Sequence, residues 1–195
     1  MIEAECKVRV RDPEGVMRQL ERHAAGRAEV YQDTYFDTPD GALRREGREL
    51  RVRTVRGPDG TRAVLTYKDA PVDEASGSKP EHETRVDDPD AVHAMLRGLG
   101  YVSSIVFEKQ CRNHEFEAYG RRMLATLVRV PEIDGVFLEV ETLVKDDELP
   151  AALEDVRAVL DDLGFTERDL TTELYTEAVA AARRPSATEC GDGHE

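Results

Sequence analysis

The amino-acid sequence predicts an α+β protein whose antiparallel strands close, or nearly close, into a barrel with a polar interior. Three observations support this prediction. Short segments in which apolar and charged residues alternate recur along most of the chain, and this is the period of half-buried strands. Turn signals connect most of these segments as hairpins, which favours antiparallel pairing. The charged faces carry both signs, so a closed sheet that hides them needs a polar lumen.

In the first half of the chain, strands are predicted at 2–10, 32–37, 49–55 and 62–68. Asp12-Pro13 supplies a helix N-cap and a first-turn proline, and apolar residues at helical spacing then predict a helix over 13–24. The Gly57-Pro58-Asp59-Gly60 turn predicts that the third and fourth strands form a hairpin.

In the second half, four more strands are predicted at 81–86, 105–116, 123–130 and 136–144. A second Asp-Pro pair, Asp88-Pro89, opens a helix that runs to Gly98. Two further helices are predicted at 149–163 and 171–183. Residues 184–195 show no periodic pattern, and we expect a disordered tail there. The prediction is therefore one domain over 1–183.

Composition narrows the class of protein. The 195 residues are 39% hydrophobic and 35% charged, which is enough apolar material for one core beneath a highly charged surface. The formal net charge of −14 argues against nucleic acid as a partner, because bulk electrostatics would repel it. A polyanionic substrate would need a local cationic pocket.

Cysteine usage and hydropathy predict a cytoplasmic protein. The three cysteines, Cys6, Cys111 and Cys190, form no C-x-x-C pair, and a sparse, odd set is typical of a reducing compartment. The chain starts in a charged strand without a signal-peptide pattern, and no apolar run is long enough to cross a membrane. No membrane partner is expected.

An internal similarity suggests a duplicated plan. The run Glu3 to Lys7 reads E-x-E-x-cation, and so does Glu81 to Arg85. Each run leads into an Asp-Pro helix start with the same acid-small-Val continuation. One interpretation is chance, since Asp-Pro caps are common. The other is a repeated strand–helix–strands unit whose two copies close one barrel and bring acidic strands into one lumen.

Charged residues at alternate positions give the candidate site. In an extended strand Glu3, Glu5 and Lys7 point to the same side. Paired carboxylates suit a hard cation such as Mg²⁺ or Mn²⁺, and Lys and Arg suit phosphate oxygens. Similar rows occur on other strands: Arg51/Arg53, Arg62 with Lys68, Glu81/Glu83/Arg85 and Glu139/Glu141. Each row alone also fits a solvated sheet face. The standard glycine-rich phosphate loops are absent from the sequence.

Six short motifs together resemble the CYTH superfamily, which is named for class IV adenylyl cyclases and thiamine triphosphatases. They are E-A-E-C-K at 3–7, Y-F-D-T-P at 35–39, E-L-R-V-R at 49–53, L-T-Y-K at 65–68, E-K-Q-C-R at 108–112 and F-L-E-V-E at 137–141. The resemblance spans roughly 2–177 and is closest to the cyclase group. It implies a triphosphate tunnel, an eight-stranded antiparallel β-barrel with helices packed outside, and it implies that a homodimer is possible.

The resemblance also implies roles for individual residues. Glu3, Glu5, Glu139 and Glu141 would hold the metal. The phosphate-binding residues would be Lys7, Arg51, Arg53, Lys68, Lys109 and Arg112. Catalytic roles are implied for Lys7, Glu83 and Arg85.

Two positions depart from the family pattern. Lys109 and Arg112 are three residues apart rather than two, so alternation sends one of them outward unless the strand bulges. Val128 stands where the cyclases usually carry an acidic residue. The loss of that carboxylate weakens the case for a cyclase more than the case for phosphate binding.

Three functions remain open from the sequence. The leading hypothesis is a metal-dependent enzyme that converts ATP to cyclic AMP and pyrophosphate. The second is a triphosphatase that hydrolyses inorganic triphosphate, thiamine triphosphate or a nucleotide. The third is a binding module for polyphosphate or nucleotide without turnover, and Val128 is the feature that favours it.

Overall fold

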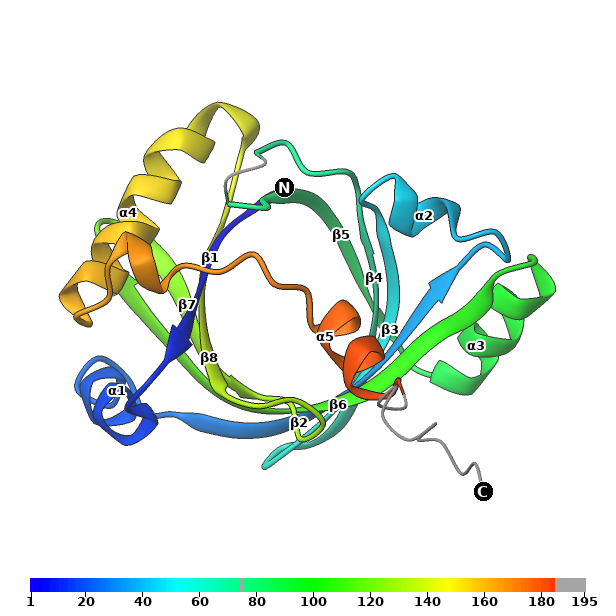
Figure 1. The fold of residues 1–195 in the computed structure, drawn as a ribbon, viewed down its shortest axis with the longest axis horizontal. Helices are drawn as coiled ribbons and strands as arrows, with labels where there is room; N and C mark the ends of the chain where they lie inside the picture. Colours follow the sequence, from blue (N-terminus) through cyan, green and yellow to red (C-terminus); the bar gives the residue numbers. More distant parts are fainter. Residues whose placement is uncertain (74–75, 185–195) are drawn as a thin grey trace, which may run out of the picture.

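In the computed structural model, which describes residues 1–73 and 76–184, eight strands form one closed antiparallel barrel (Figure 1). Their order around the barrel is β1-β5-β4-β3-β2-β6-β7-β8, and β8 pairs again with β1. The strands are β1 (Ile2–Val10), β2 (Arg27–Asp37), β3 (Glu49–Gly57), β4 (Gly60–Lys68), β5 (Lys79–Val86), β6 (Val102–Ala118), β7 (Arg121–Arg129) and β8 (Val136–Val144). The barrel expected from the sequence is confirmed.

Helices pack around this barrel, with α1 and α4 on one side and α2 and α3 on the other (Figure 1). The helices are α1 (Pro13–Leu20), α2 (Ala42–Arg45), α3 (Pro89–Gly98), α4 (Leu149–Asp162) and α5 (Tyr175–Ala182). Both predicted Asp-Pro caps are confirmed: the side chains of Asp12 and Asp88 each accept a 2.9 Å bond from a backbone N–H three residues later. The short helix α2 was not predicted from the sequence.

The strand order supports the duplicated plan. If β1–β4 are exchanged with β5–β8, the order around the barrel maps onto itself. Each half forms a three-stranded meander, and its first strand pairs with the last strand of the other half: β1 with β8, and β5 with β4. The two E-x-E strands, β1 and β5, are therefore neighbours.

Most of the apolar core lies outside the lumen, beneath the helices. One cluster joins the outer face of β1, β7 and β8 to α4 and α1, and includes Val8, Leu138 and Val156. A second joins β2 and β3 to α2 and α3. A third lies under α5 and includes Phe137 and Val179; it is on the lumen side of the barrel, because Phe137 shares the strand face of Glu139. Because the helices cover the outer strand faces, the alternate charged positions face inward.

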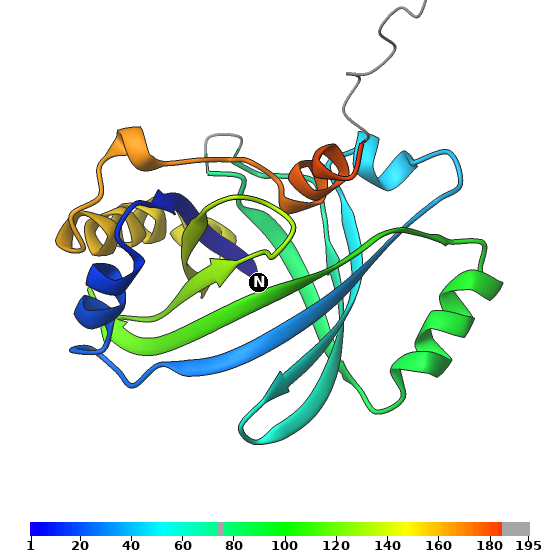
Figure 2. The ribbon, with the colours of Figure 1, turned by 60° about the horizontal axis from the view of Figure 1, so that its bottom comes forward.

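The chain after α4 crosses one end of the barrel and completes its wall (Figure 2). Strand β1 pairs with β5 only near its start, at Ile2 and Glu3. Further along, residues 170–174, here called the C-terminal strap, lie against the free edge of β1. Val8 bridges to Leu170, and Thr171 donates its N–H to the Lys7 carbonyl at 2.9 Å.

These contacts explain why the predicted helix at 171–183 begins only at Tyr175: the strap is held in an extended form by β1. Similarly, the helix predicted over 13–24 ends at Leu20 and continues as turns. Of the predicted tail, only Arg184 lies within the described residues. Among those residues, no helix combines the length and hydropathy of a membrane span.

Candidate active site in the barrel lumen

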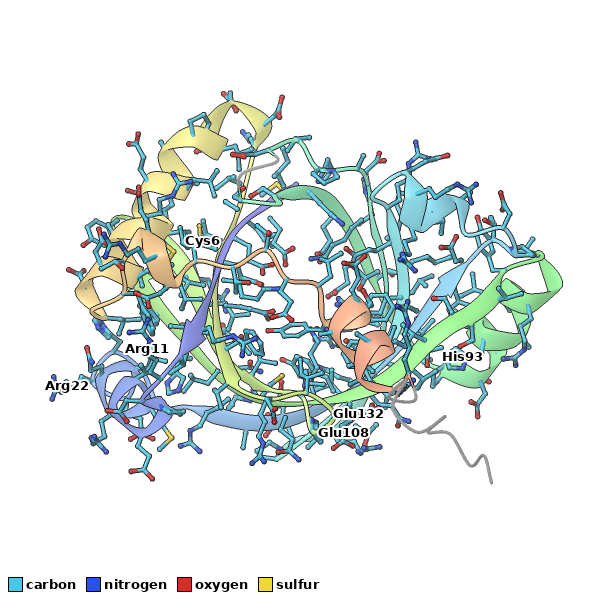
Figure 3. The ribbon with its side chains drawn as sticks, viewed as in Figure 1. Cys6, Arg11, Arg22, His93, Glu108 and Glu132 are labelled. Atoms are coloured by element: carbon cyan, nitrogen blue, oxygen red, sulfur yellow. The ribbon has the colours of Figure 1, made fainter. Side chains whose placement is uncertain are left out.

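The barrel contains a cavity of about 520 Å³ whose wall carries many charged side chains of both signs. Figure 3 shows side chains from the whole ring of strands projecting into this space, whereas the labelled Arg22 and His93 lie outside it. Its acidic residues are Glu3, Glu5, Glu49, Glu81, Glu83, Glu139 and Glu141, and its basic residues are Lys7, Arg51, Arg53, Arg62, Lys68, Lys79 and Lys109. Strand alternation thus brings most of the predicted site residues into one lumen.

Three of the four predicted metal ligands form a compact cluster. Carboxylate oxygens of Glu3, Glu5 and Glu141 all lie within 4.8 Å of one another. Burial and the charges of Glu139 and Glu3 raise the pKa of Glu5 to about 7. Burial and the charges of Glu3 and Glu5 also raise the pKa of Glu141 well above its usual value. Crowded, buried carboxylate oxygens are the donor set that a hard divalent cation prefers, so these residues fit Mg²⁺ or Mn²⁺.

The fourth predicted ligand, Glu139, is separate from this cluster. It lies directly across from Lys7 in the β1–β8 pairing. Burial alone would raise the pKa of Glu139, but Lys109 and Lys7 outweigh it and hold the pKa below its usual value. In this arrangement the negative charge of Glu139 offsets the positive charges of Lys7 and Lys109.

Two arginines of β3 form the basic wall. Arg53 makes two hydrogen bonds to Asp33, at 2.6 and 2.7 Å, and stacks over the Tyr31 ring at 4.4 Å. Arg51 is 8% exposed, donates a 3.4 Å hydrogen bond to Thr66 and lies 4.0 Å from an Asp33 oxygen, and its Nε has no partner among the described residues. A buried guanidinium with unused donors is well suited to bind phosphate oxygens.

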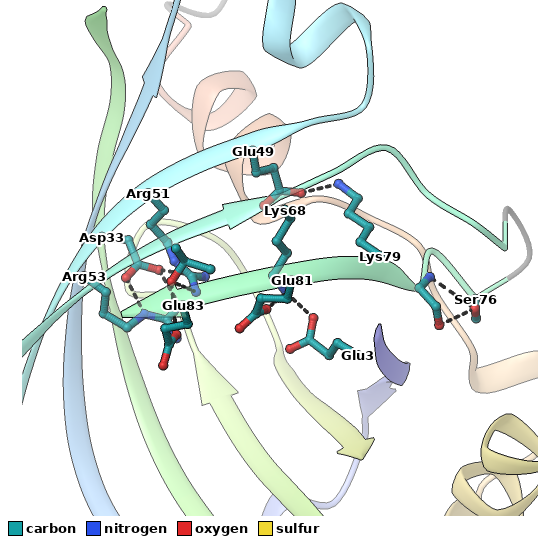
Figure 4. A network of polar contacts seen from close by, with 12 residues as sticks. Glu3, Asp33, Glu49, Arg51, Arg53, Lys68, Ser76, Lys79, Glu81 and Glu83 are labelled. Carbon is teal, nitrogen blue, oxygen red and sulfur yellow. Dashed lines mark hydrogen bonds and ion pairs between the residues drawn. The ribbon is translucent and has the colours of Figure 1, made fainter. Parts of the chain in front are cut away.

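Lys68 joins the acidic and basic parts of the cavity (Figure 4). Its ammonium group pairs with Glu3 and lies 3.0 Å from a Glu81 oxygen. Burial alone would lower the pKa of Lys68, but Glu3 and Glu81 outweigh it and raise the pKa well above its usual value. Lys68 therefore stays charged next to the carboxylate cluster.

Of the remaining residues predicted to bind phosphate or act in catalysis, some line the 520 Å³ cavity and others lie elsewhere. Lys7 and Lys109 both reach the cavity. Glu83 lines it and accepts a 3.0 Å hydrogen bond from Thr66, although its side chain is largely exposed. Arg85, on the same strand, lies away from the carboxylate cluster and lines a second cavity.

The expectation that Arg112 binds phosphate is not supported by its position. Lys109 faces the lumen, so the residue three positions later faces outward. There Arg112 pairs with Glu21, which follows α1, at 3.0 Å. The strand irregularity in β2–β6 falls between Tyr35 and Phe36 and does not turn Arg112 inward.

Val128 occupies the lumen-facing phase of β7 but lies in an apolar environment. It is fully buried and packs in the cluster that contains Cys111, Phe137 and Tyr175. At the position where the family resemblance led us to expect an acidic residue, this chain has an apolar side chain that packs under α5.

A second cavity, of about 630 Å³, adjoins the first and shares Tyr31, Arg62 and Leu124 with it. At its wall the buried Glu29 accepts hydrogen bonds from Arg62 at 2.7 and 3.0 Å and from Asn113 at 2.8 Å. Hydrogen bonds from Arg62 keep the pKa of Glu29 below its usual value. Because Arg62 lines both cavities, this network lies where they adjoin.

Several residues that the structure places at the site were not identified from the sequence. Asp33 and Thr66 hold the β3 arginines, and Tyr175 reaches the cavity from α5. Asp33 could have been found, because it alternates with Tyr31 and Tyr35 on one strand face. Tyr175 gave no such signal, since its place depends on how the strap crosses the barrel.

Two curated proteins to which this chain is similar carry adenylate cyclase names. The chain is 26% identical over 180 residues to the Methanocaldococcus jannaschii protein named "Putative adenylate cyclase MJ0240", covering 91% of this chain and 98% of that one. It is 29% identical over 150 residues to "Adenylate cyclase CyaB" of Aeromonas hydrophila, covering 74% and 69% of the two chains.

Solved structures share the fold. PH1819 from Pyrococcus horikoshii has a TM-score of 0.79 at 27% identity, over 93% of this chain and 99% of that one. HpAC1 from Hippeastrum, an adenylyl cyclase candidate described as having a dominant triphosphatase activity, has a TM-score of 0.64 at 15% identity, over 95% and 97%.

The family model agrees with the barrel and its charged lumen. The CYTH domain model matches residues 1–175, which include all eight strands and end at the first residue of α5. The chain belongs to the CYTH domain family.

Proposed function

We propose that this protein is a metal-dependent enzyme that acts on a triphosphate, with conversion of ATP to cyclic AMP and pyrophosphate as the leading reaction. One observation carries the proposal: the Glu3, Glu5 and Glu141 cluster shares a cavity with buried lysines and arginines. The adenylate cyclase names of the two curated relatives support this choice of reaction.

The proposed metal site consists of Glu3, Glu5 and Glu141, with Glu139 nearby. Mg²⁺ or Mn²⁺ bound there would neutralise phosphate charge and lower the pKa of the attacking group. In the cyclase reaction the 3′-hydroxyl oxygen bonds to the α-phosphorus while the bond to the bridging oxygen breaks. Pyrophosphate leaves with the electron pair, and the hydroxyl proton passes to solvent or to a carboxylate.

The basic wall would hold the phosphate chain and the leaving group. Arg51 can bind phosphate oxygens in a bidentate manner through its unused donors, and Arg53 is fixed beside it by Asp33. Lys7, Lys68 and Lys109 add point charges around the same cavity. Since burial removes competing water, these charges stabilise developing negative charge more strongly than exposed ones would.

The second candidate is a triphosphatase that uses the same tunnel, with water as the attacking group. Two observations favour it. HpAC1, a structural neighbour, is described as having a dominant triphosphatase activity. In this chain, moreover, the acid typical of the cyclases is replaced by the buried Val128.

Product identification separates these functions. The protein is incubated with ATP, inorganic triphosphate and thiamine triphosphate, each with Mg²⁺ or Mn²⁺, and a chelator sample serves as the control. Cyclic AMP with pyrophosphate supports the cyclase. Orthophosphate without a cyclic product overturns the cyclase in favour of the triphosphatase. Tight binding without any product supports a non-catalytic polyphosphate or nucleotide binding module. A cytoplasmic location and a homodimer remain predictions.

A further inference from the structure

Tyr175 is the first residue of α5 and brings a phenol into the barrel. Its side chain is 6% exposed and lines the 520 Å³ cavity. The ring packs edge-on against Phe137, with 5.3 Å between the ring centroids and 83° between the ring planes. This contact fixes the ring from one side, at the base of the C-terminal strap.

Two cations contact the ring within the cavity. The ammonium nitrogen of Lys109 lies 4.2 Å from the ring centroid and that of Lys7 lies 4.5 Å from it. Each contact is within the range of a cation–π interaction. The phenol ring is therefore a shared contact of two cations that reach the cavity, and an anionic group held by either of them would lie near the phenol.

The Tyr175 hydroxyl has no hydrogen-bond partner among the described residues, although the oxygen is buried. The Glu139 carboxylate is nearby, and burial together with this charge raises the pKa of the phenol, yet the two groups do not make a hydrogen bond of normal geometry. The hydroxyl is thus a protonated donor. A buried donor without a partner is destabilising, so the hydroxyl is available to an acceptor from outside the chain.

We propose that Tyr175 is a further substrate-contacting residue, whose hydroxyl donates a hydrogen bond to an anionic oxygen of the phosphate chain in the part of the cavity that Lys7 and Lys109 reach. This inference rests on the proposed function, because it takes a triphosphate as the ligand. It adds α5 and the strap to the binding site. The strap then has a role beyond closing the barrel wall, since its extended path places the phenol.

The test measures binding separately from turnover. Binding of inorganic triphosphate, with a chelator present and no metal, is measured by calorimetry for wild type, Tyr175→Phe and Tyr175→Leu. Phe keeps the ring beside the lysines and removes only the donor, so the dissociation constant should rise about tenfold. Leu also removes the ring, so the rise should be larger. Val179→Ala is the matched control, because Val179 is buried on the same helix but does not line the cavity.

The outcomes separate the two proposals. Equal binding by wild type and Tyr175→Phe overturns this inference and leaves the proposed function intact. Failure of wild type to bind any triphosphate, with or without metal, overturns both. An equal loss in Val179→Ala and Tyr175→Phe also overturns the inference, because the loss then reflects helix packing. Thermal melting checks that each variant is folded, and Tyr175→Phe decides the question if Tyr175→Leu is not.

Discussion

At the scale of single residues, the lumen contains arrangements that stability alone would not favour. Glu5 lies directly across from Glu141 in the β1–β8 pairing, and both side chains point into the cavity. Like charges that face each other across two strands destabilise a sheet. Burial, together with the charges of neighbouring carboxylates, raises the pKa of both carboxyls. A bound cation would relieve it, which is the physical argument for a metal site here.

The first prediction concerns Glu5. Glu5→Gln removes one metal ligand and one buried charge, so metal-dependent turnover should fall by at least about 100-fold. The free energy of unfolding without metal should rise by up to about 1 kcal/mol, because the repulsion with Glu141 is gone. Product assays and urea denaturation in chelator measure the two effects. Glu14→Gln, which changes an exposed carboxylate on α1, should alter neither. Unchanged turnover in Glu5→Gln would show that the metal assignment is wrong.

The second prediction concerns Asp33, whose carboxylate is fully buried against Arg53. Burial alone would raise the pKa of Asp33, but Arg53 outweighs it and holds the pKa well below its usual value. The pair therefore stabilises the fold fully above the unfolded-state pKa of about 4, and this stabilisation is lost as pH falls toward the folded-state pKa.

Asp33→Asn should therefore lower the free energy of unfolding by about 3–5 kcal/mol at pH 7, because Arg53 stays buried without its charge partner. The difference from wild type should narrow below about pH 4. Urea denaturation at several pH values measures both. A difference that stays constant down to the most acidic pH would contradict the assigned ion pair.

At the scale of elements, alternation along each strand decided which charged residues enter the site. It placed Lys109 inside and Arg112 outside, and it could be read from the sequence once the strand was known. The N-caps of α1 and α3 could also be predicted from the sequence, because an Asp-Pro pair leaves the backbone few conformations other than a helix start. The start of α5 could not be predicted in this way, since contacts with β1 override the local helix preference of the strap residues.

The third prediction compares the two caps. Asp12→Ala and Asp88→Ala each remove one side-chain hydrogen bond to a backbone N–H and should each cost about 1 kcal/mol of unfolding free energy. Chemical denaturation measures the costs, and hydrogen exchange locates them in α1 and α3. Neither change should alter triphosphate binding, because both caps lie outside the lumen. A cost near zero for either variant would mean that its cap contributes nothing to stability.

At the scale of the whole molecule, a strongly acidic protein encloses a cavity with basic side chains on its wall. The net charge is −14, whereas the lumen cavity is lined by seven basic and seven acidic side chains, so the negative charge is not concentrated there. The exterior repels a triphosphate at long range, and the basic wall attracts it at short range. Salt screens exposed charges at long range more than buried ones.

The fourth prediction follows from this difference in screening. The association rate for ATP, at fixed free metal, should rise when the NaCl concentration is raised from roughly 10 mM to 150 mM, because the Debye length falls to about 8 Å. Stopped-flow measurements with a fluorescent ATP analogue test this, and an uncharged salt substitute at equal osmolality is the control. A rate that falls steeply with salt would show that exposed cations, not the lumen, steer the substrate.

The sequence alone determined the alternating strands, the capped helices, the barrel and most of the charged residues that line it. These follow from local rules: a period of two, turn residues, and the need to hide a charged face in a polar lumen. Tertiary structure alone decided which carboxylates cluster, because Glu3, Glu5 and Glu141 meet through the closing β1–β8 pairing while Glu139 turns to the lysines. It also brought Tyr175 to the cavity, since the path of the strap depends on the free edge of β1, a strand far from it along the chain.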